Sequence, residues 1–335
     1  MNQSEQKSFC AICVDMGTTN TRVWLVRGDE VLARRQTEAG VRDTAREGSS
    51  NKIRSALREL IADIRLETSE EVFPTCVAAA GMITSPLGLA EVPHLIAPAG
   101  LKELSAGVKQ LFFPEICELP FLFVPGIRSG AAATNFETIN QKDVMRGEET
   151  LCVGLIESGR VQPPATILNL GSHWKAIRID AEKRIAASLT SLSGELIHVT
   201  QTNTILASAV PAGKALEFDA DWCEAGMNEQ RRSGLARALF CVRLFELGKR
   251  GTPEQRMSFL IGAYIASDLD ALLNRGLIAS GNPVLLTGSG AAAIGWQQGL
   301  KLASIKAEIL SADDIEKGLI RGLKTLTGNR QSTPL

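Results

Sequence analysis

The feature that most constrains this chain is a strand–turn–strand pattern that occurs twice, about half a chain apart. In the first copy an apolar run ends near Asp15, and a turn at 17–20 leads into a second apolar run. In the second copy Asn169 takes the place of Asp15, and 171–173 form the turn. Apolar runs of this length that are bounded by Gly, Thr and Asn are typical of strands. The repeat therefore predicts two similar domains, each beginning with a hairpin.

Each turn carries glycine and hydroxyl groups, which suit an anion. Glycine lets another group approach the backbone closely, successive N–H groups form an anion-binding concavity, and hydroxyls add donors. A carboxylate at Asp15 suits a hydrated Mg²⁺, which keeps several of its own waters. An ordinary β-turn is the alternative, because Asp, Gly and Thr also favour turns for local reasons. The pattern lacks the Walker lysine, and its turn leads into a strand instead of a helix.

A third segment, 283–294, consists of a short apolar run, the Gly-Ser-Gly turn at 288–290 and a run of small residues. We interpret it as a buried strand, a turn and a helix, with room for adenine and ribose against the turn. A Gly-Ser-Gly turn alone is weak evidence, because many α/β proteins have one. Its position after two hairpin turns strengthens the interpretation.

Composition excludes several classes of protein. The chain has 36 basic and 37 acidic residues among 335, without a basic stripe, so we expect no nucleic-acid partner. No apolar run reaches the roughly 20 residues that span a bilayer, and the polar segment 1–8 does not resemble a signal peptide. The seven cysteines are an odd number and most lie in apolar runs, which is typical of reduced core residues. We expect a cytoplasmic protein without a membrane partner.

The pattern of apolar residues predicts an N-terminal domain over 1–157 and a C-terminal domain over 165–335. Gly318 and Gly322 lie four residues apart in the last predicted helix, which suits close packing on another helix at the domain junction. A merely destabilised terminal helix is the alternative. The segment 209–230 has no clear pattern and is interpreted as a Pro/Gly-rich insert. The helices that periodicity predicts cover 49–66, 143–156, 194–208, 231–249, 254–275, 290–302 and 312–326.

The predicted helix over 143–156 carries an acidic residue on its apolar stripe. Val144, Glu148 and Leu151 fall on that stripe, together with Cys152 and Leu155. A carboxylate on a buried face needs a partner, which a helix N-terminus and a ligand cleft can supply. Glu148 is therefore a candidate for chemistry, although a glutamate at a helix start is also favoured by the dipole alone.

The blocks along the chain resemble the 2-dehydro-3-deoxygalactonokinase family, within the actin, Hsp70 and sugar-kinase superfamily. The block at Asp15 indicates only the superfamily, whereas those at 144–150 and 171–175 are more specific. Further blocks at 80–82, 193–196 and 287–290 occur in the family's order. The resemblance implies an α/β fold of two ribonuclease-H-like (actin-like) domains that face an interdomain ATP cleft.

The resemblance also implies a reaction and its participants. ATP would phosphorylate the 6-hydroxyl of 2-dehydro-3-deoxy-D-galactonate, giving ADP and 2-dehydro-3-deoxy-6-phosphogalactonate in galactonate catabolism. Asp15 would hold Mg²⁺ through water, and Lys175 would neutralise charge that develops during transfer. Residues expected to bind ATP are Gly17, Thr18, Thr19, Asn20, Gly171, Ser172, His173, Gly288, Ser289 and Gly290.

The substrate and base residues follow from the same expectation. Glu148 is the first candidate for the general base and Glu149 the second. A sugar acid calls for an arginine, whose planar fork binds carboxylates; Arg146 is preferred over Arg128. Gly81 and Met82 would line the sugar pocket, although plain core packing explains Met82 equally well.

Other functions remain open at this point. A kinase for another sugar or sugar acid would keep the ATP site and change only the pocket. An actin-like or Hsp70-like ATPase would turn over ATP without a sugar. The sequence does not fix the stereochemistry of the sugar acid, the role of 209–230 or the oligomeric state, for which a homodimer is one option.

Overall fold

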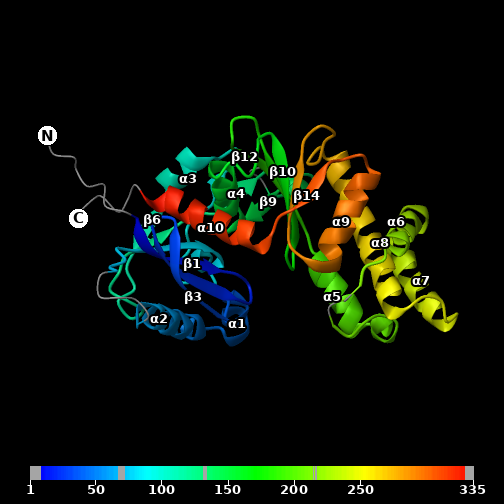
Figure 1. Ribbon diagram of the computed structural model, residues 1–335, viewed down its shortest axis with the longest axis horizontal. Helices are drawn as coiled ribbons and strands as arrows, with labels where there is room; N and C mark the ends of the chain where they lie inside the picture. The colour runs from blue at the N-terminus through cyan, green and yellow to red at the C-terminus, as the bar shows by residue number, and fades with distance from the viewer. Residues whose placement is uncertain (1–8, 67–71, 131–133, 214, 216, 329–335) are drawn as a thin grey trace. The chain divides into compact units, whose positions relative to one another are not determined.

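The protein is described by a computed structural model that covers residues 9–66, 72–130, 134–213, 215 and 217–328 (Figure 1). Contacts divide the chain into two compact units. Unit 1 comprises 1–161 together with 313–335, and unit 2 comprises 162–312. The polar segment 1–8, which we judged unlike a signal peptide, lies outside the described residues.

Unit 1 is built on a mixed six-stranded sheet in the order β3-β2-β1-β4-β7-β6. The first three strands form an antiparallel meander, and β4 and β7 continue the sheet parallel to β1. β6 closes the edge antiparallel to β7. The bounds are β1 (Cys10–Met16), β2 (Thr21–Arg27), β3 (Glu30–Thr37), β4 (Val77–Gly81), β6 (Lys109–Leu111) and β7 (Phe121–Phe123).

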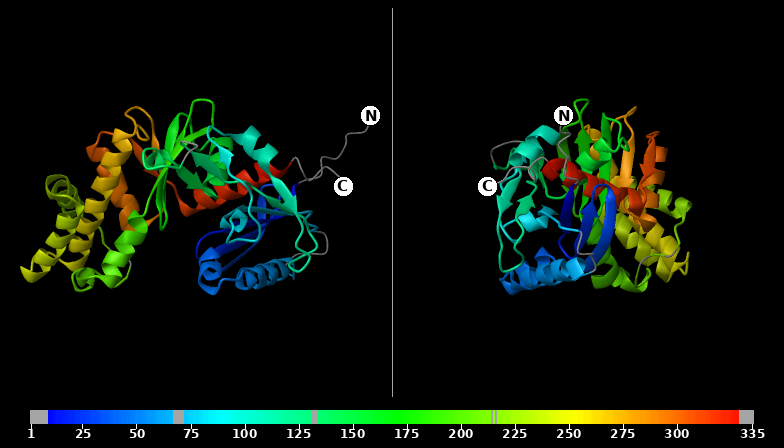
Figure 2. Two further views of the ribbon diagram at one scale, coloured as in Figure 1. Left: turned by 180° about the vertical axis from the view of Figure 1, so that it is seen from behind. Right: turned by 60° about the vertical axis from the view of Figure 1, so that its left-hand side comes forward.

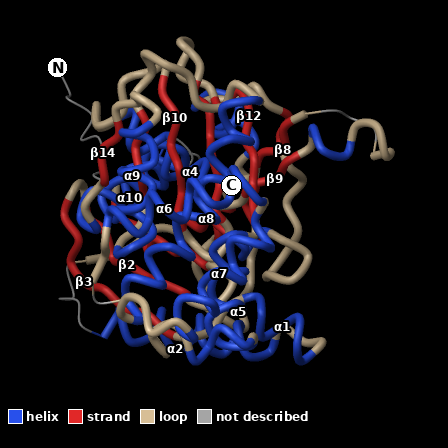
Figure 3. The backbone as a smooth tube through the Cα atoms, turned by 90° about the vertical axis from the view of Figure 1, so that its right-hand side faces the viewer, coloured by secondary structure: helices blue, strands red, loops and turns tan. Residues whose placement is uncertain are grey.

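Helices cover both faces of this sheet. Successive side chains of β2 point to opposite faces and are buried on both, so both faces need a covering layer. Val23 and Leu25 pack into one core with α2 (Asn51–Leu66). The intervening Trp24 points to the opposite face, where its Nε1 donates to Glu316 of α10 (Ala312–Thr327) at 3.1 Å. Figures 2 and 3 show α2 alongside β2 and β3, and Figure 2 shows α10 on the other side of the sheet. The predicted helix over 49–66 is α2, and a separate helix, α1 (Val41–Glu47), precedes it.

The last helix of the chain belongs to unit 1, whereas the sequence analysis placed it in the C-terminal domain. It crosses α4 (Glu148–Glu157) at glycines. A Cβ on Gly322 would lie 2.0 Å from the carbonyl oxygen of Thr150, and one on Gly154 would lie 1.7 Å from that of Gly318. The expected close helix packing through Gly318 and Gly322 is therefore confirmed. The crossing of α10 with α4 packs the C-terminal part of unit 1 against its N-terminal part.

The region between β4 and α4 differs from the prediction. The predicted helix over 143–156 is wrong at its start: 143–145 form a strand, and Val144 is exposed. Gly147 has φ of 107°, which an α-helix does not accept, so the helix begins at Glu148. The short elements of this region are η1 (Met82–Thr84), β5 (Leu95–Ile96), α3 (Leu101–Gly107), β8 (Ile127–Ser129), η2 (Ile139–Gln141) and β9 (Asp143–Met145), with β5, β8 and β9 forming a small sheet.

Unit 2 repeats the strand order of unit 1. Its sheet runs β12-β11-β10-β13-β14, an antiparallel meander followed by two parallel strands. The β1–β2 hairpin and β4 thus have counterparts in the β10–β11 hairpin and β13, which confirms the internal repeat. The bounds are β10 (Ala165–Leu170), β11 (Trp174–Ile179), β12 (Ile185–Ser191), β13 (Val284–Thr287) and β14 (Ala307–Ile309).

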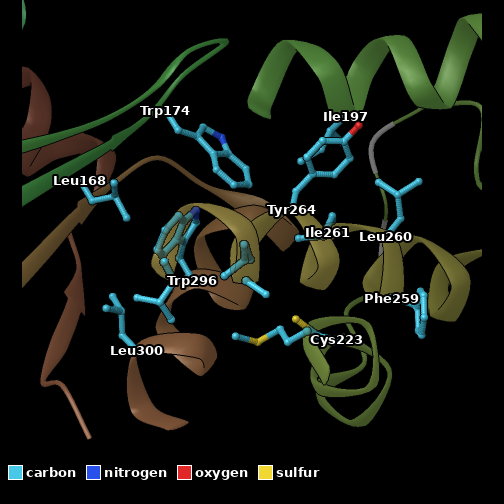
Figure 4. Packing of buried hydrophobic residues seen from close by; sticks show 14 of the residues in the cluster. Leu168, Trp174, Ile197, Cys223, Phe259, Leu260, Ile261, Tyr264, Trp296 and Leu300 are labelled. Atoms are coloured by element: carbon cyan, nitrogen blue, oxygen red, sulfur yellow. The ribbon is translucent and has the colours of Figure 1, made fainter. Parts of the chain in front are cut away.

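Helices pack on one face of the unit 2 sheet around a large apolar core (Figure 4). Trp174 of β11 and Trp296 of a helix meet edge to face, with ring centroids 5.6 Å apart. The interpretation of 209–230 as an insert is wrong for its second half, because Asp219 caps a helix that starts at Ala220. The helices are α5 (Ser193–Asn203), η3 (Ile205–Ser208), α6 (Ala220–Ser233), α7 (Leu235–Leu247), α8 (Pro253–Asn274) and α9 (Gly290–Leu302).

Among the helices of the described residues, none is long and apolar enough to cross a membrane.

Candidate functional site

Asp15 lies near the end of β1, between a charged neighbour on one strand and a small apolar neighbour on the other. In register it stands beside Arg22 of β2 on one side and Ala80 of β4 on the other. Its carboxylate lies 3.7 Å from the Arg22 guanidinium, and 21% of its side chain is exposed. The Asp15 carboxylate is thus largely, but not fully, removed from solvent.

The electrostatic setting of Asp15 favours a cation that would approach it. Burial raises the pKa of this carboxyl to about 6, Arg22 acts against that shift, and the negative charge of Glu148 adds to it. The described residues contain no group of three or more His, Cys, Asp or Glu side chains that could hold a metal. A single carboxylate with bound water fits Mg²⁺ beside a nucleotide, because this ion retains most of its waters.

Two glycines bring other segments close to Asp15. Gly81 ends β4 with φ of 87°, and a Cβ there would lie 2.5 Å from the Met16 carbonyl oxygen and 3.2 Å from Asp15 Oδ1. Gly147 packs on Gly81, where a Cβ would lie 3.1 Å from the Gly81 Cα. The sequence analysis selected Gly81 but not Gly147. Met82, the next predicted residue, begins η1 and is partly exposed.

The two candidate bases at the start of α4 lie in different environments. Glu149 is fully buried, and both its carboxylate oxygens accept the Gly147 N–H, at 2.8 and 2.9 Å. Glu148 is partly exposed, accepts the Arg146 N–H at 3.2 Å, and acts electrostatically on Asp15. Glu149 therefore binds the backbone N–H of the N-cap residue Gly147, whereas Glu148 lies close enough to Asp15 to raise the pKa of that carboxyl.

The backbone of the turn at 17–20 packs against Gly40, a glycine that no sequence pattern signalled. The Gly17 N–H donates to the Asn20 carbonyl at 2.8 Å, which closes the turn. A Cβ on Gly40 would lie 2.5 Å from the Thr18 carbonyl oxygen, and the Arg42 N–H donates to that oxygen at 2.9 Å. The start of α1 therefore holds the turn in place. Thr18 and Thr19 are partly exposed and Asn20 is exposed.

Unit 2 supports its own turn in the same way. A Cβ on Gly194, in the first turn of α5, would lie 2.4 Å from the Gly171 carbonyl oxygen and 2.6 Å from that of Ser172. The next residue, Glu195, lies with Oε2 3.2 Å from His173 Nε2. Gly171 and Ser172 are exposed. The block at 193–196 belongs to the family resemblance, and no sequence pattern signals its support of the turn.

Asn169 and Lys175 share the face of the unit 2 sheet that points away from the apolar core. Their neighbours Leu168, Trp174 and Ala176 belong to that core, so alternation turns Asn169 and Lys175 to the other face. The Asn169 Oδ1 accepts the Thr287 hydroxyl at 2.7 Å. Lys175 stands opposite Asn169 in register and is buried, with 6% of its surface exposed.

The Gly-Ser-Gly turn follows β13, as predicted. Gly288 has φ of 144°, and a Cβ there would lie 2.8 Å from the Leu170 Cβ. Gly290, with φ of 73°, starts α9 and has open space around it, and Ser289 is exposed. The turn thus leaves its backbone accessible next to the end of β10.

The predicted arginine is engaged by neutral groups. The Arg146 guanidinium donates from Nη1 to the Thr84 hydroxyl at 2.9 Å and from Nη2 to the Val92 carbonyl at 2.8 Å. His94 Nδ1 lies 3.4 Å from the same Nη2. The alternative, Arg128, lies on β8 with an exposed side chain. No sequence pattern signalled Thr84 or His94, because neither lies within a recognisable motif.

The predicted residues form one cluster in each unit. In unit 1, Asp15, Gly81 and Glu148 lie together, and Arg146 adjoins them through Thr84, whose hydroxyl also donates to the Gly81 carbonyl at 3.1 Å. In unit 2, the turn at 171–173, the buried Lys175 and the turn at 288–290 lie at or near the end of β10.

Comparison with known proteins identifies similar sequences and folds. The family model for 2-keto-3-deoxy-galactonokinase matches residues 15–323. The curated 2-dehydro-3-deoxygalactonokinase of Escherichia coli strain K12 is 26% identical over 328 residues, which cover 95% of this chain and 98% of that protein.

Solved structures share the fold. A Sinorhizobium meliloti protein with the provisional name 2-dehydro-3-deoxygalactonokinase superposes with a TM-score of 0.74 at 21% identity, covering 96% of this chain and all of that one (100%). The activator of 2-hydroxyisocaproyl-CoA dehydratase from Clostridium difficile, solved with bound ADPNP, gives a TM-score of 0.52 at 11% identity over 98% of this chain and 99% of its own.

Proposed function

Because the chain belongs to the 2-keto-3-deoxy-galactonokinase family and is a carbohydrate kinase with an actin-like ATPase fold, we propose that it phosphorylates 2-dehydro-3-deoxy-D-galactonate. ATP is the phosphoryl donor, the 6-hydroxyl is the acceptor, and the products are ADP and 2-dehydro-3-deoxy-6-phosphogalactonate. The match to the Escherichia coli enzyme over 95% of the chain carries this proposal. The reaction belongs to galactonate catabolism, and its need for ATP favours the cytoplasm.

In the proposed reaction the 6-hydroxyl oxygen attacks the γ-phosphorus, and the bond to the β,γ-bridging oxygen breaks. Glu148 accepts the hydroxyl proton, because it is the partly exposed carboxylate beside Asp15. Glu149 is the weaker candidate, since both its oxygens are already bonded to the Gly147 N–H inside the core. Phosphoryl transfer depends mainly on positioning and charge neutralisation, so one base suffices.

The remaining residues bind the nucleotide. We assign the turns at 17–20 and 171–173 to the phosphates, Lys175 to charge neutralisation, and the turn at 288–290 to adenosine. Asp15 would hold Mg²⁺ through water, and the ion would supply neutralisation of the phosphate charge. Gly81 and Met82 would border the sugar acid, and Arg146 would attract its carboxylate.

The test is ADP production from MgATP with a panel of acceptors. The panel contains 2-dehydro-3-deoxy-galactonate, its gluconate epimer and neutral hexoses. A parallel purification from cells that do not express the protein controls for contaminating kinases, and Glu148→Gln protein tests the base. We expect strong stimulation by the galactonate compound alone, and a product phosphorylated at O6.

Other outcomes would replace parts of the proposal. Stimulation by a different acid would keep the mechanism and change the substrate. Slow ADP release that no sugar accelerates would reject the sugar-acid substrate and favour an ATPase. Equal activity of the Glu148→Gln protein would remove Glu148 as the base.

A further inference from the structure

Arg146 carries a charge that its hydrogen bonds do not neutralise. The guanidinium of Arg146 bonds to three groups, a hydroxyl, a backbone carbonyl and an imidazole nitrogen, and all three are neutral. Burial lowers the pKa of Arg146, and the negative charges of Glu149 and Glu91 oppose that shift. A guanidinium remains protonated in proteins under such conditions, so Arg146 is a half-buried cation.

Two of the five donors of this guanidinium remain available. Within the described residues, Nη1 uses one N–H on Thr84, and Nη2 uses both of its own on Val92 and His94. The Nε–H and the second Nη1 hydrogen are left over. A planar, partly desolvated cation with spare donors suits a carboxylate, to which charge-assisted bonds are about twice as strong as neutral ones.

His94 and Thr84 fix the plane of that guanidinium. Since a guanidinium only donates, His94 Nδ1 must be the acceptor, which places the proton of a neutral ring on Nε2. Gly126 lets Arg146 and His94 approach each other, because a Cβ on Gly126 would lie 2.7 Å from Arg146 Cγ and 2.8 Å from His94 Cδ2. The imidazole therefore packs beside the arginine as well as bonding to it.

Thr84 also connects the arginine to the proposed reaction centre. Its hydroxyl accepts from Arg146 Nη1 and donates to the Gly81 carbonyl, at 2.9 and 3.1 Å. Gly81 in turn lies close to Asp15, since a Cβ on Gly81 would be 3.2 Å from Asp15 Oδ1. The anion-attracting group is thus held at a fixed separation from the residues assigned to phosphoryl transfer.

From this arrangement we propose that Thr84 and His94 are positioning residues that aim Arg146 at the carboxylate of the substrate and so select sugar acids over neutral sugars. The inference rests on the proposed function for its substrate class. It goes further by assigning selectivity to two residues outside the family motifs.

The experiment compares His94→Leu with His94→Asn, because Asn can place an acceptor near the position of Nδ1. We expect His94→Leu to raise KM for the sugar acid about tenfold, the effect of losing one bond to a charged group. KM for ATP should stay within about twofold, well below that tenfold step, and Asn should restore most of the loss. His198→Leu, an exposed histidine on α5, is the matched control. Thr84→Val is a second variant that loses the hydroxyl but keeps the shape.

Selectivity is the decisive readout. We expect His94→Leu and Thr84→Val to lose the discrimination between D-gluconate and D-glucitol that the wild type shows, measured as competitive inhibition of the reaction of each protein. An unchanged KM for the sugar acid in His94→Leu, or equal losses for gluconate and glucitol, would overturn the inference, as would failure of Asn to restore binding. Circular dichroism and thermal unfolding verify that each variant is folded.

Failure of the proposed function is separable from failure of this inference. If no sugar acid is phosphorylated, calorimetric titration of the MgADP-bound protein with gluconate and glucitol still tests the anion site. Gluconate binding that Arg146→Met abolishes and His94→Leu weakens would support the inference alone. Equal binding of both probes would overturn it.

Discussion

At the scale of single residues, two adjacent glutamates at the start of α4 lie in different environments. Glu149 turns inward and caps the Gly147 N–H, while Glu148 remains partly exposed near Asp15. Adjacent residues on a helix point about 100° apart, so one can cap the helix while the other faces a ligand. The sequence alone could not separate them.

Glu148→Gln should lower kcat by about 10²- to 10⁴-fold, the usual contribution of a general base. The midpoint of thermal unfolding should hardly change, because the side chain is partly exposed. Glu149→Gln should instead lower stability by about 1 kcal/mol while kcat changes little. Steady-state kinetics and denaturant unfolding of both variants measure this, and the reverse pattern would move the base to Glu149.

Asp15 should make the unliganded protein less stable as pH rises. Its pKa is about 6 in the folded protein and about 3.9 in an unfolded chain. The folded state holds the proton more tightly, so the favourable contribution is complete below about pH 4 and is lost as pH rises through about 6.

Asp15→Asn removes this loss. The variant should therefore gain up to about 3 kcal/mol at pH 8, and almost nothing near pH 4, while losing activity. Urea unfolding of both proteins without nucleotide, over that pH range, measures the gain. A variant that is no more stable than wild type at pH 8 would contradict the assigned environment.

At the scale of elements, the turns at 17–20 and 171–173 each lie against the start of a helix. Gly40 lies against Thr18 in unit 1, and Gly194 lies against Gly171 and Ser172 in unit 2. Because the contacting atoms are backbone, a methyl group at either glycine must displace the turn. The second copy of the motif thus includes its supporting helix as well as its hairpin.

Gly194→Ala should reduce kcat/KM for ATP by about tenfold to a hundredfold, because small misplacements of binding groups are costly. Gly213→Ala, where a Cβ meets nothing within 4 Å, is the matched control. The measurement is steady-state kinetics with ATP varied. Unchanged kinetics in Gly194→Ala would show that the turn does not bind the phosphates.

The close crossing of α4 and α10 depends on glycines, which have no Cβ at the contact. Alanine favours a helix over glycine by about 1 kcal/mol, so propensity alone predicts that Gly322→Ala is stabilising. The Thr150 carbonyl, 2.0 Å from such a Cβ, predicts the opposite sign, a loss of about 1–3 kcal/mol. Urea unfolding decides, with the exposed Lys317→Ala on the same helix as control; a more stable Gly322→Ala protein would contradict the crossing.

At the scale of the whole molecule, the five strands of the unit 2 sheet match the first five of unit 1 in order, but equivalent positions hold different side chains. Unit 1 has the carboxylate Asp15 where unit 2 has the amide Asn169, and Lys175 of unit 2 stands where unit 1 has Arg22. The two units thus share a strand arrangement but hold side chains of different charge at equivalent positions.

Removal of divalent metal should stop catalysis and leave the fold intact. We expect EDTA to abolish ADP formation, excess Mg²⁺ to restore it, and the unfolding midpoint without nucleotide to stay unchanged. The reason is that the described residues offer no cluster of metal ligands on which folding could depend. A large fall in the unfolding midpoint with EDTA would indicate a structural metal.

The sequence by itself determined the features that rest on local pattern. The repeated apolar run, glycine turn and apolar run predicted both hairpins, and periodicity predicted α2, α8 and α9, because these signals come from neighbours in the chain. The family blocks predicted the fold and the class of enzyme.

Tertiary structure decided what depends on distant partners. The strand at 143–145 forms because β8 pairs with it, which outweighs a helical apolar pattern. The last helix joins unit 1 because Gly318 and Gly322 fit the backbone of α4. Burial, and not position in a motif, separates the two glutamates. Glu149 is fully buried on the Gly147 N–H, whereas Glu148 stays partly exposed, because only the folded chain sets which carboxylate loses its water.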